Sequence, residues 1–211
     1  MKQELKDLAG LKELDTIFFI ADTEKQAALF AGQIRTELGN RLDLLEKNAY
    51  RFCYINDFPM FEYNVEEKKI GFTHNPFSMP QGGLEALNEK DPLEILAYQY
   101  DIVCNGVELS SGAVRNHDMQ IMEKAFEIAG YDKSVLEEKF GALYNAFQFG
   151  APPHAGMAPG VDRMIMLLRN EENIREVIPF PMSGTAQDLM CGAPNEVTEQ
   201  QLREVHIKVR Q

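Results

Sequence analysis

The sequence is poor in cysteine and has no long hydrophobic run, which excludes several classes of protein. Its three cysteines lie far apart, without the spacing of a zinc site or a disulfide framework. Cys53 and Cys104 fall in apolar, strand-like runs and are expected to be small buried thiols. No apolar run approaches the roughly 20 residues of a membrane span, and the N-terminus lacks the apolar segment of a secretory signal. We therefore expect a cytoplasmic protein with no membrane association.

Basic residues are also scarce relative to acidic ones. The chain has 21 Lys and Arg against 33 Asp and Glu, a formal net charge of −12. Non-specific binding of nucleic acids depends on Lys and Arg that neutralise phosphates. We therefore do not expect this chain alone to bind RNA tightly.

The first 48 of the 211 residues read as a small α/β unit. Residues 2–13 have the leucine spacing of a helix, and Thr16–Ala21 is a β-rich run. Thr23 and Gln26 have the spacing of a capping box, which predicts a helix with a buried apolar face that ends at Gly39.

From Tyr50 onward the pattern indicates strands that pair as hairpins. The clearest signal is Tyr98–Leu109, where Asn105-Gly106 favours a type I′ turn. Helices follow, with Asp118 as one cap and Ser134 as another that forms a capping box with Glu137. The composition (45% hydrophobic, 26% charged) is that of a globular protein. We expect an α+β fold, a mostly antiparallel sheet flanked by helices.

The segment from Gly150 to Arg163 is a candidate phosphate site. Its glycines allow close approach of the backbone to a ligand, and Arg163 lies at the start of a helix. That helix is apolar on nearly every side and is expected to be buried. An alternative that fits the spacing equally well is a local salt bridge between Asp162 and Arg163.

Glu108 and Arg115 form a second candidate cluster. A carboxylate beside a Gly/Ser-rich turn can hold magnesium bound to phosphates, and an arginine can bind a carboxylate with two nitrogens. The alternative is a cross-strand ion pair, which contributes little. The two are seven positions apart, an odd number, so in a regular strand they face opposite ways. A shared pocket requires a bulge or break around Ser110–Gly112.

His74 lies in a loop bounded by prolines, between Phe72 and Gly83. Long ordered loops are often functional, and donors here could close over a small polar substrate. Composition alone favours the alternative of an exposed histidine with no role.

Three segments, FTHNPFSMP from Phe72, NGVELSSGAVRNHD from Asn105 and GAPPHAGMAPGVDRMIML from Gly150, resemble bacterial aspartyl-tRNA synthetases in order and spacing. The resemblance runs from about Tyr50 to the end. It implies that residues 49–211 correspond to the C-terminal part of a class II catalytic domain, with the third signature motif present. Residues 1–48 more weakly resemble the end of the domain inserted in the bacterial enzymes. The third motif alone does not distinguish aspartyl-tRNA synthetases from the synthetases for asparagine and lysine.

The resemblance also implies roles for individual residues. Gly160, Val161, Asp162 and Arg163 would form the third motif, with Arg163 on the ATP γ-phosphate. Glu108 would hold ATP and its Mg²⁺, and Arg115 would bind the side-chain carboxylate of aspartate. His74 would belong to a loop that contacts aspartate. The catalytic residues would thus be Arg163, Arg115 and Glu108, acting by positioning and charge stabilisation.

The family joins L-aspartate to tRNA(Asp) through aspartyl-adenylate, and the full-length enzyme is expected to be a homodimer. Asn75 stands where many relatives have a second histidine, and Ser110 and Ser111 stand where many have glycines. No segment resembles the first two class II motifs or the anticodon-binding domain. The isolated chain is therefore expected to be inactive. The alternative is a stand-alone, non-catalytic paralogue that binds nucleotide, amino acid or a protein partner.

Overall fold

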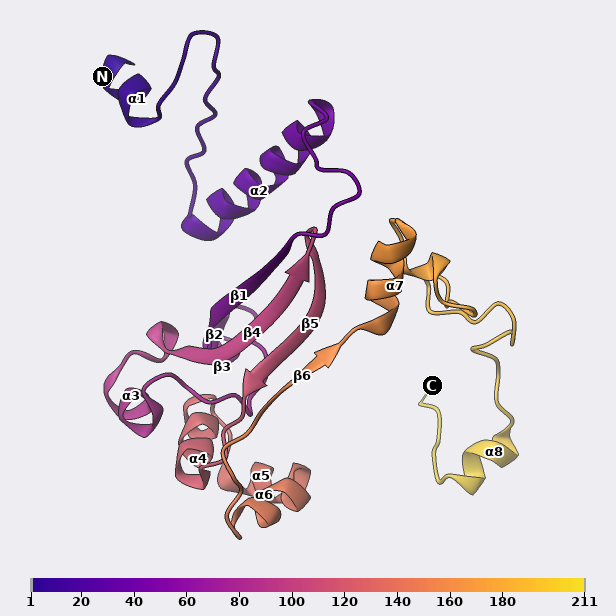
Figure 1. Ribbon diagram of the computed structural model, residues 1–211. Coiled ribbons are helices and arrows are strands. Elements are labelled where there is room, and N and C mark those ends of the chain that lie inside the picture. The colour runs from indigo at the N-terminus through magenta and orange to yellow at the C-terminus, as the bar shows by residue number, and fades with distance from the viewer. Residues whose placement is uncertain (1, 211) are drawn as a thin grey trace. The chain divides into compact units, whose positions relative to one another are not determined.

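The computed structural model describes residues 2–210 and divides the chain into two compact units, Met1–Ala49 and Tyr50–Gln211 (Figure 1). The division falls one residue after the boundary suggested by the sequence. The correspondence of each unit to a domain of a longer enzyme stays a prediction. None of the helices in the described part of the chain is long and apolar enough to cross a lipid bilayer.

The first unit contains two helices, α1 (Lys2–Leu8) and α2 (Glu24–Arg41), and within residues 2–49 no strand. The predicted α/β character is therefore wrong, because the β-rich run at Thr16–Ala21 finds no strand to pair with. Thr23 precedes α2 without a side-chain capping bond. The predicted buried face is also wrong, since α2 has no buried residue and Phe30 is exposed.

The second unit is built on a four-stranded antiparallel sheet in the order β1-β4-β5-β6, which confirms the predicted fold class. The strands are β1 (Phe52–Pro59), β4 (Leu96–Cys104), β5 (Val107–Val114) and β6 (Ala155–Pro159). The predicted turn between β4 and β5 is confirmed: Asn105 and Gly106 have φ angles of 51° and 82°, as a type I′ turn requires.

The strand β6 lies inside the segment from Gly150 to Arg163, where the sequence indicated no strand. Ala155–Pro159 pairs with Ser110–Val114 on β5. The close approach depends on Gly112, where a Cβ atom would lie 2.4 Å from the carbonyl oxygen of Gly156. The proline-rich flanks hid this strand, because proline is tolerated at the edge of a sheet but argues against a strand in sequence.

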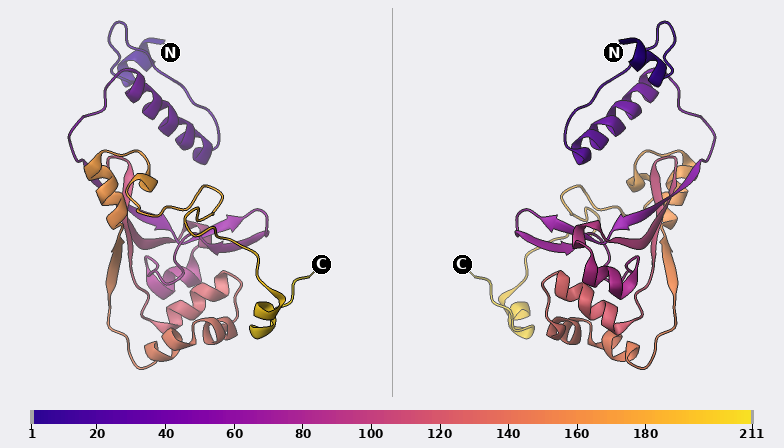
Figure 2. Two further views of the ribbon diagram at one scale, coloured as in Figure 1. Left: turned by 90° about the vertical axis from the view of Figure 1, so that its right-hand side faces the viewer. Right: turned by 90° about the vertical axis from the view of Figure 1, so that its left-hand side faces the viewer.

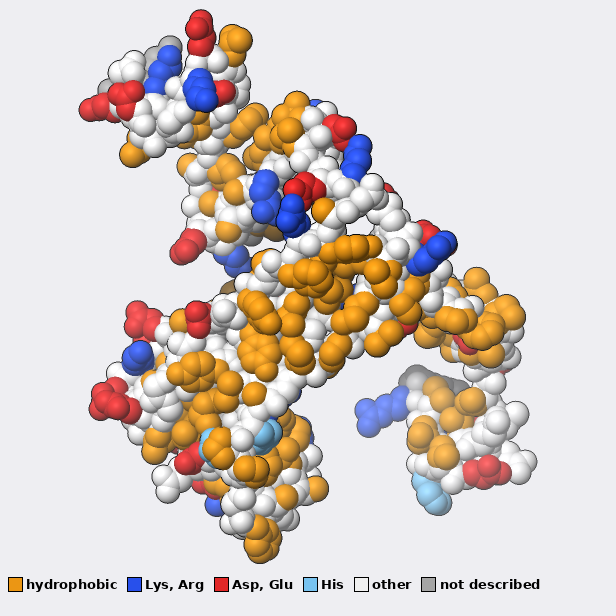
Figure 3. Space-filling view, in the orientation of Figure 1, with side chains coloured by type: hydrophobic (Ala, Val, Ile, Leu, Met, Phe, Trp, Pro, Cys, Tyr) orange, Lys and Arg blue, Asp and Glu red, His pale blue; other side chains and the backbone are white. Residues whose placement is uncertain are grey.

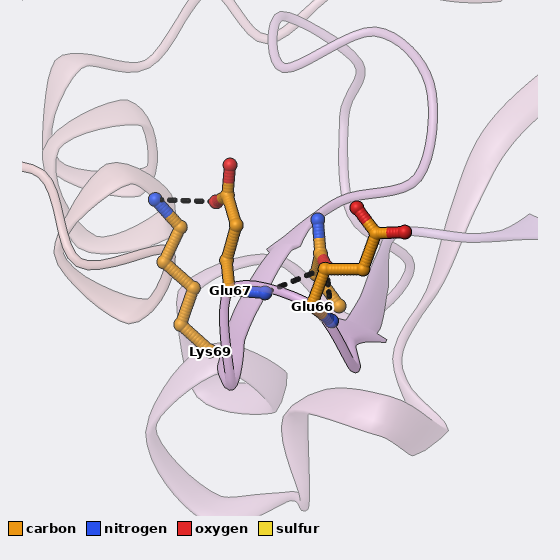
Figure 4. A network of polar contacts seen from close by, with 4 residues as sticks. Glu66, Glu67 and Lys69 are labelled. Atoms are coloured by element: carbon orange, nitrogen blue, oxygen red, sulfur yellow. Dashed lines mark hydrogen bonds and ion pairs between the residues drawn. The ribbon is translucent and has the colours of Figure 1, made fainter.

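A separate two-stranded hairpin is formed by β2 (Phe61–Asn64) and β3 (Lys69–Phe72), with Glu66 and Glu67 in its turn. The Asn64 side-chain oxygen accepts hydrogen bonds from the amides of Glu66 and Glu67, at 2.9 and 3.0 Å (Figure 4). The Lys69 ammonium lies 2.8 Å from the Glu67 carboxylate. The hydrogen bond and charge of Glu67 raise the pKa of Lys69 above its ordinary value.

Short helices gather at one end of the sheet, as Figures 1 and 2 show from three directions. They are α3 (Gly83–Glu89), the 3-10 helix η1 (Pro92–Glu94), α4 (Met119–Ile128), α5 (Lys133–Lys139) and α6 (Gly141–Phe147). Two apolar clusters form the core there. One joins the hairpin, β4 and the helices α3 and α4 through Met60, Phe61, Leu87, Ile95, Ala97, Ala125 and Ala129. The other joins α4, α5 and α6 through Met122, Phe126, Leu136 and Tyr144.

The two predicted helix caps in this region have different outcomes. Asp118 accepts hydrogen bonds from the amides of Gln120 and Ile121, which confirms it as the cap of α4. Ser134 is not a cap, because α5 begins at Lys133, after Asp132. The single helix expected there is divided at Phe140, whose φ of −126° is not helical.

The C-terminal part contains α7 (Val161–Arg169), the 3-10 helix η2 (Ile174–Glu176) and α8 (Glu199–Glu204). The predicted burial of α7 is wrong. Met166 is its one buried residue, and Val161 and Leu168 are 62% and 68% exposed. Cys53 on β1 is exposed as well, against prediction, while Cys104 is buried. Both errors have the same cause: the described residues place no layer over these apolar positions.

Candidate functional site

A cavity of about 320 Å³ opens on one face of the four-stranded sheet. Three of the residues singled out from the sequence line it together: His74, Glu108 and Arg115. They come from the loop after β3, from the start of β5 and from the residue after β5. The remaining lining residues are Phe58, Asn75, Gln99, Asp101, Ser111, Gly112, Ala113 and Ala158.

A β-bulge in β5 brings Glu108 and Arg115 to the same face. Ile102 pairs with Ser110 and the next residue, Val103, pairs with Glu108, so Leu109 is the extra residue. Leu109 and Ser110 are consecutive yet both buried, as a bulge allows. The irregularity required by the sequence is therefore present, one residue before the predicted stretch. Ser111, Ala113 and Arg115 then alternate onto the Glu108 face.

Glu108 and Arg115 do not pair with each other. Within residues 2–210 the Arg115 side chain makes no hydrogen bond or salt bridge. Its backbone is held from both sides: the Arg115 amide donates a hydrogen bond to the His154 carbonyl at 2.9 Å, and Arg115 forms a β-bridge with Ser78. A half-buried guanidinium with no acid beside it is suited to bind an external carboxylate.

Glu108 pairs instead with Arg163. The Arg163 Nη1 atom donates to the Glu108 carboxylate at 3.0 Å and to its main-chain carbonyl at 2.7 Å. This arrangement replaces the local pair of Asp162 and Arg163 that the spacing also allowed. Both side chains remain about half exposed, at 44% for Arg163 and 47% for Glu108. Water can therefore screen the pair, and a phosphate can compete for it.

The other residues of the predicted third motif lie where β6 passes into α7. Gly160 precedes the helix, and its amide donates to the Leu109 carbonyl at 2.7 Å. Val161 and Asp162 form the first turn of α7 and are exposed. None of these three lines the cavity. They directly precede Arg163, whose side chain reaches Glu108.

The imidazole ring of His74 packs edge-on against the Phe58 ring, with 5.2 Å between ring centroids. His74 is exposed and lines the cavity, while residues 75–77 are half-buried and Ser78 is buried. The aromatic contact favours this edge-on orientation of the imidazole beside the cavity.

Sequence reasoning missed two polar residues of the cavity, Gln99 and Asp101. Both lie on β4, where the register pairs Asp101 with Ser111 and Gln99 with Ala113. Cross-strand partners face the same side of a sheet. Counting back from the Asn105-Gly106 turn could have placed Asp101 and Gln99 on the Glu108 side, because Val103 pairs with Glu108 and side chains alternate along β4.

Asp101 and Glu108 give the cavity two carboxylates. In the described residues, no group of three or more His, Cys, Asp or Glu side chains could hold a metal ion. Mg²⁺ is commonly held by one or two carboxylates together with substrate phosphates and water. The donor set therefore fits a magnesium ion that arrives with a phosphate ligand, and does not fit a metal centre made by protein alone.

Comparison with known proteins gives a consistent result. A family model described as "tRNA synthetases class II (D, K and N)" matches residues 3–184. The aspartate–tRNA(Asp/Asn) ligase of Zymomonas mobilis is 62% identical over 205 residues, which are 97% of this chain and 34% of that protein. The ligase of the same name from Ehrlichia canis is 56% identical, over 98% of this chain and 35% of that protein. The chain thus spans about a third of the length of these relatives.

Solved structures with low sequence identity also match. An aspartyl-tRNA synthetase from Entamoeba histolytica has a TM-score of 0.48 and 23% identity, over 89% of this chain and 32% of that chain. An asparaginyl-tRNA synthetase from the same organism has a TM-score of 0.48 and 18% identity, over 88% of this chain and 35% of that chain.

Proposed function

The chain belongs to the class II tRNA synthetases of the D, K and N type, and from this premise we propose that it forms an ATP- and aspartate-binding part of an aspartate–tRNA ligase. The whole enzyme would activate L-aspartate with ATP to aspartyl-adenylate and transfer the aspartyl group to tRNA(Asp). The relatives are named for both tRNA(Asp) and tRNA(Asn), so we include tRNA(Asn) among the proposed acceptors. We propose a cytoplasmic homodimer for the whole enzyme.

The observation that carries the proposal is the convergence of His74, Glu108 and Arg115 on one cavity, with Arg163 paired to Glu108 beside it. Arg115 would bind the side-chain carboxylate of aspartate. Asparagine offers a neutral amide in the same place, and a buried guanidinium that loses its ionic partner costs about 3–5 kcal/mol. Since Arg115 is only half-buried here, the lower part of that range is the relevant one.

Arg163 would exchange its contact with Glu108 for the γ-phosphate of ATP, with Gly160, Val161 and Asp162 setting the start of its helix. Glu108 and Asp101 would then be available to Mg²⁺ carried by the nucleotide. Bound in this way, the ion supplies charge neutralisation to the phosphates. The protein residues orient the aspartate carboxylate and the nucleotide for in-line displacement, so catalysis rests on positioning and charge stabilisation.

Titration of the chain with L-aspartate and L-asparagine tests the proposal, followed by NMR on isotope-labelled protein. We expect aspartate to shift the resonances of His74 and Arg115 and to bind at least tenfold more tightly than asparagine. The Arg115→Met variant should lose this preference. The Arg169→Met variant, at the exposed end of α7, is the matched control and should retain it. Equal affinity for the two amino acids in the wild-type chain would refute the assignment of Arg115.

A chimera tests the activity itself. Residues of this chain would replace the matching third of the Zymomonas mobilis ligase, and aspartate-dependent exchange between ATP and pyrophosphate would be measured. We expect exchange within tenfold of the parent ligase, abolished by Arg163→Met. A folded, dimeric chimera without exchange would contradict the proposed function.

A further inference from the structure

Gln99 is the buried polar side chain of the cavity for which the sequence suggested no role. It lies in the middle of β4 and is 7% exposed. Its side-chain nitrogen donates to the Ser78 hydroxyl at 2.7 Å and to the Asn75 carbonyl at 3.3 Å. A carbonyl can only accept, so the contact with Asn75 fixes which end of the amide is the nitrogen.

Both partners of Gln99 belong to the segment that carries His74. The Asn75 side chain accepts a hydrogen bond from the Phe77 amide at 2.8 Å, and the Ser78 amide donates to the Asn75 carbonyl at 3.3 Å. These bonds close a tight turn directly after His74. On the other side of His74, the Thr73 amide donates to the Met60 carbonyl at 3.1 Å. The backbone of His74 is thus held by its two immediate neighbours.

The same contact reaches Arg115. Ser78 is fully buried and is the β-bridge partner of Arg115. The next residue, Met79, donates its amide to the Val114 carbonyl at 2.9 Å. The Gln99 amide therefore lies at the junction of three segments: β4, the His74 loop and the end of β5. A buried amide in such a network costs free energy unless its hydrogen bonds are made, so the network favours one arrangement of the three segments.

We propose that Gln99 is a positioning residue, which through Ser78 and Asn75 sets the placement of His74 and Arg115 around a bound amino-acid carboxylate. This role rests on the proposed function and adds a residue to it. Gln99 acts through the loop, while His74 and Arg115 are the groups that touch the ligand. Its removal should therefore weaken binding of aspartate and leave binding of MgATP unchanged.

The test uses the full chain and the Gln99→Met variant, which keeps the length of the side chain and removes both donated bonds. Without ligand, hydrogen exchange at the Ser78 and Met79 amides should rise at least tenfold, with exchange in β1 unchanged. With ligand, the dissociation constant for L-aspartate should rise at least fivefold and that for MgATP less than twofold. Gln81→Met is the matched control. Gln81 lies in the same loop as His74. Its side-chain amide donates a hydrogen bond to the Asp57 carboxylate at 2.5 Å, and neither residue lines the cavity.

A double-mutant cycle with Ser78→Ala separates positioning from general loss of structure. As a single change, Ser78→Ala should weaken aspartate binding. In the Gln99→Met background it should have no further effect, because both changes remove the same hydrogen bond between Gln99 and Ser78. Additive effects, or equal losses for aspartate and MgATP, would overturn the role of Gln99. If the wild-type chain binds no aspartate, the proposed function fails. The exchange rates at Ser78 and Met79 still decide whether Gln99 holds the loop.

Discussion

Arg163 donates two hydrogen bonds from one nitrogen to Glu108, to the carboxylate at 3.0 Å and to the main-chain carbonyl at 2.7 Å. The contact joins the first turn of α7 to the residue before the bulge in β5. It brings together two residues that the sequence assigned separately to phosphate and to magnesium. Because both side chains are about half exposed, the contact is open to exchange with a ligand.

The exposure of this pair leads to a prediction about Arg163→Met. An exposed ion pair contributes about 0–1 kcal/mol, so the free energy of unfolding should change by less than about 1 kcal/mol. The affinity for MgATP should fall at least tenfold, since the γ-phosphate loses its cation. Chemical denaturation and nucleotide titration measure the two quantities. A large loss of stability with unchanged MgATP affinity would show that the pair is structural.

A hydrogen-bonded network of three side chains should make stability depend on pH. Its members are Glu123, Lys133 and Tyr144. The Tyr144 hydroxyl donates to the Glu123 carboxylate at 2.6 Å, and the Lys133 ammonium lies 3.0 Å from it. The Tyr144 bond is the largest cause that lowers the pKa of Glu123, with Lys133 adding to it. The pKa of Lys133 is raised, chiefly by Tyr144.

A carboxylate with a lowered folded-state pKa stabilises the protein above its ordinary value of 4.5, and this stabilisation is lost as pH falls through the lowered pKa. Wild type should therefore exceed Glu123→Gln in unfolding free energy at about pH 6–7, by on the order of 1 kcal/mol. The gap should close below 4.5. Lys133 stays charged over this whole pH range because its pKa is raised, so it does not contribute to the change of stability with pH. Glu127→Gln, which alters an exposed pair with Lys124, should give a flat difference. A gap that persists in acid would contradict the network.

Gly112→Ala should disrupt the attachment of β6. The added Cβ atom would lie 2.4 Å from the Gly156 carbonyl oxygen and 2.5 Å from the Tyr100 ring. We expect a loss of about 1–3 kcal/mol in unfolding free energy, with faster hydrogen exchange in Ala155–Pro159. The control is Gly156→Ala, on the partner strand, where a Cβ atom meets nothing within 4 Å. Equal stability of the two variants would refute the close packing.

The sheet face opposite the cavity exposes hydrophobic side chains, so we expect the isolated chain to self-associate. Hydrophobic side chains gather over the strands in Figure 3. Phe52 pairs with Cys104 and Tyr54 with Ile102, which places them on one face, 65% and 68% exposed. The edge strand β1 carries a single charged residue, Asp57, although edge strands are usually protected by charge.

The double variant Phe52→Ser, Tyr54→Ser should raise the self-dissociation constant at least tenfold in sedimentation equilibrium. Tyr63→Ser, on the hairpin and 52% exposed, should have no effect; a wild-type monomer would contradict the prediction.

The sequence by itself determined the features that depend on neighbours in the chain. The Asn105-Gly106 turn and the Asp118 cap follow from the conformations and hydrogen bonds of a few consecutive residues. Membership of the family could likewise be recognised from short motifs, because a motif is a run of consecutive residues that can be read without knowing its tertiary contacts. The same local logic failed at Ser134, where the spacing of a capping box was present but Asp132 precedes the helix.

Only the tertiary structure decided which distant residues meet and which apolar residues are covered. Asp101 and Gln99 entered the site because β4 pairs with β5, and the bulge at Leu109 turned Arg115 to the same face as Glu108. The helix α7 is exposed because burial depends on a partner layer, which its own apolar pattern cannot supply. Strand register and burial are properties of at least two segments at once. A pattern read along one segment therefore singles out candidate residues, while the pairing of strands determines which of them, and which others, line one cavity.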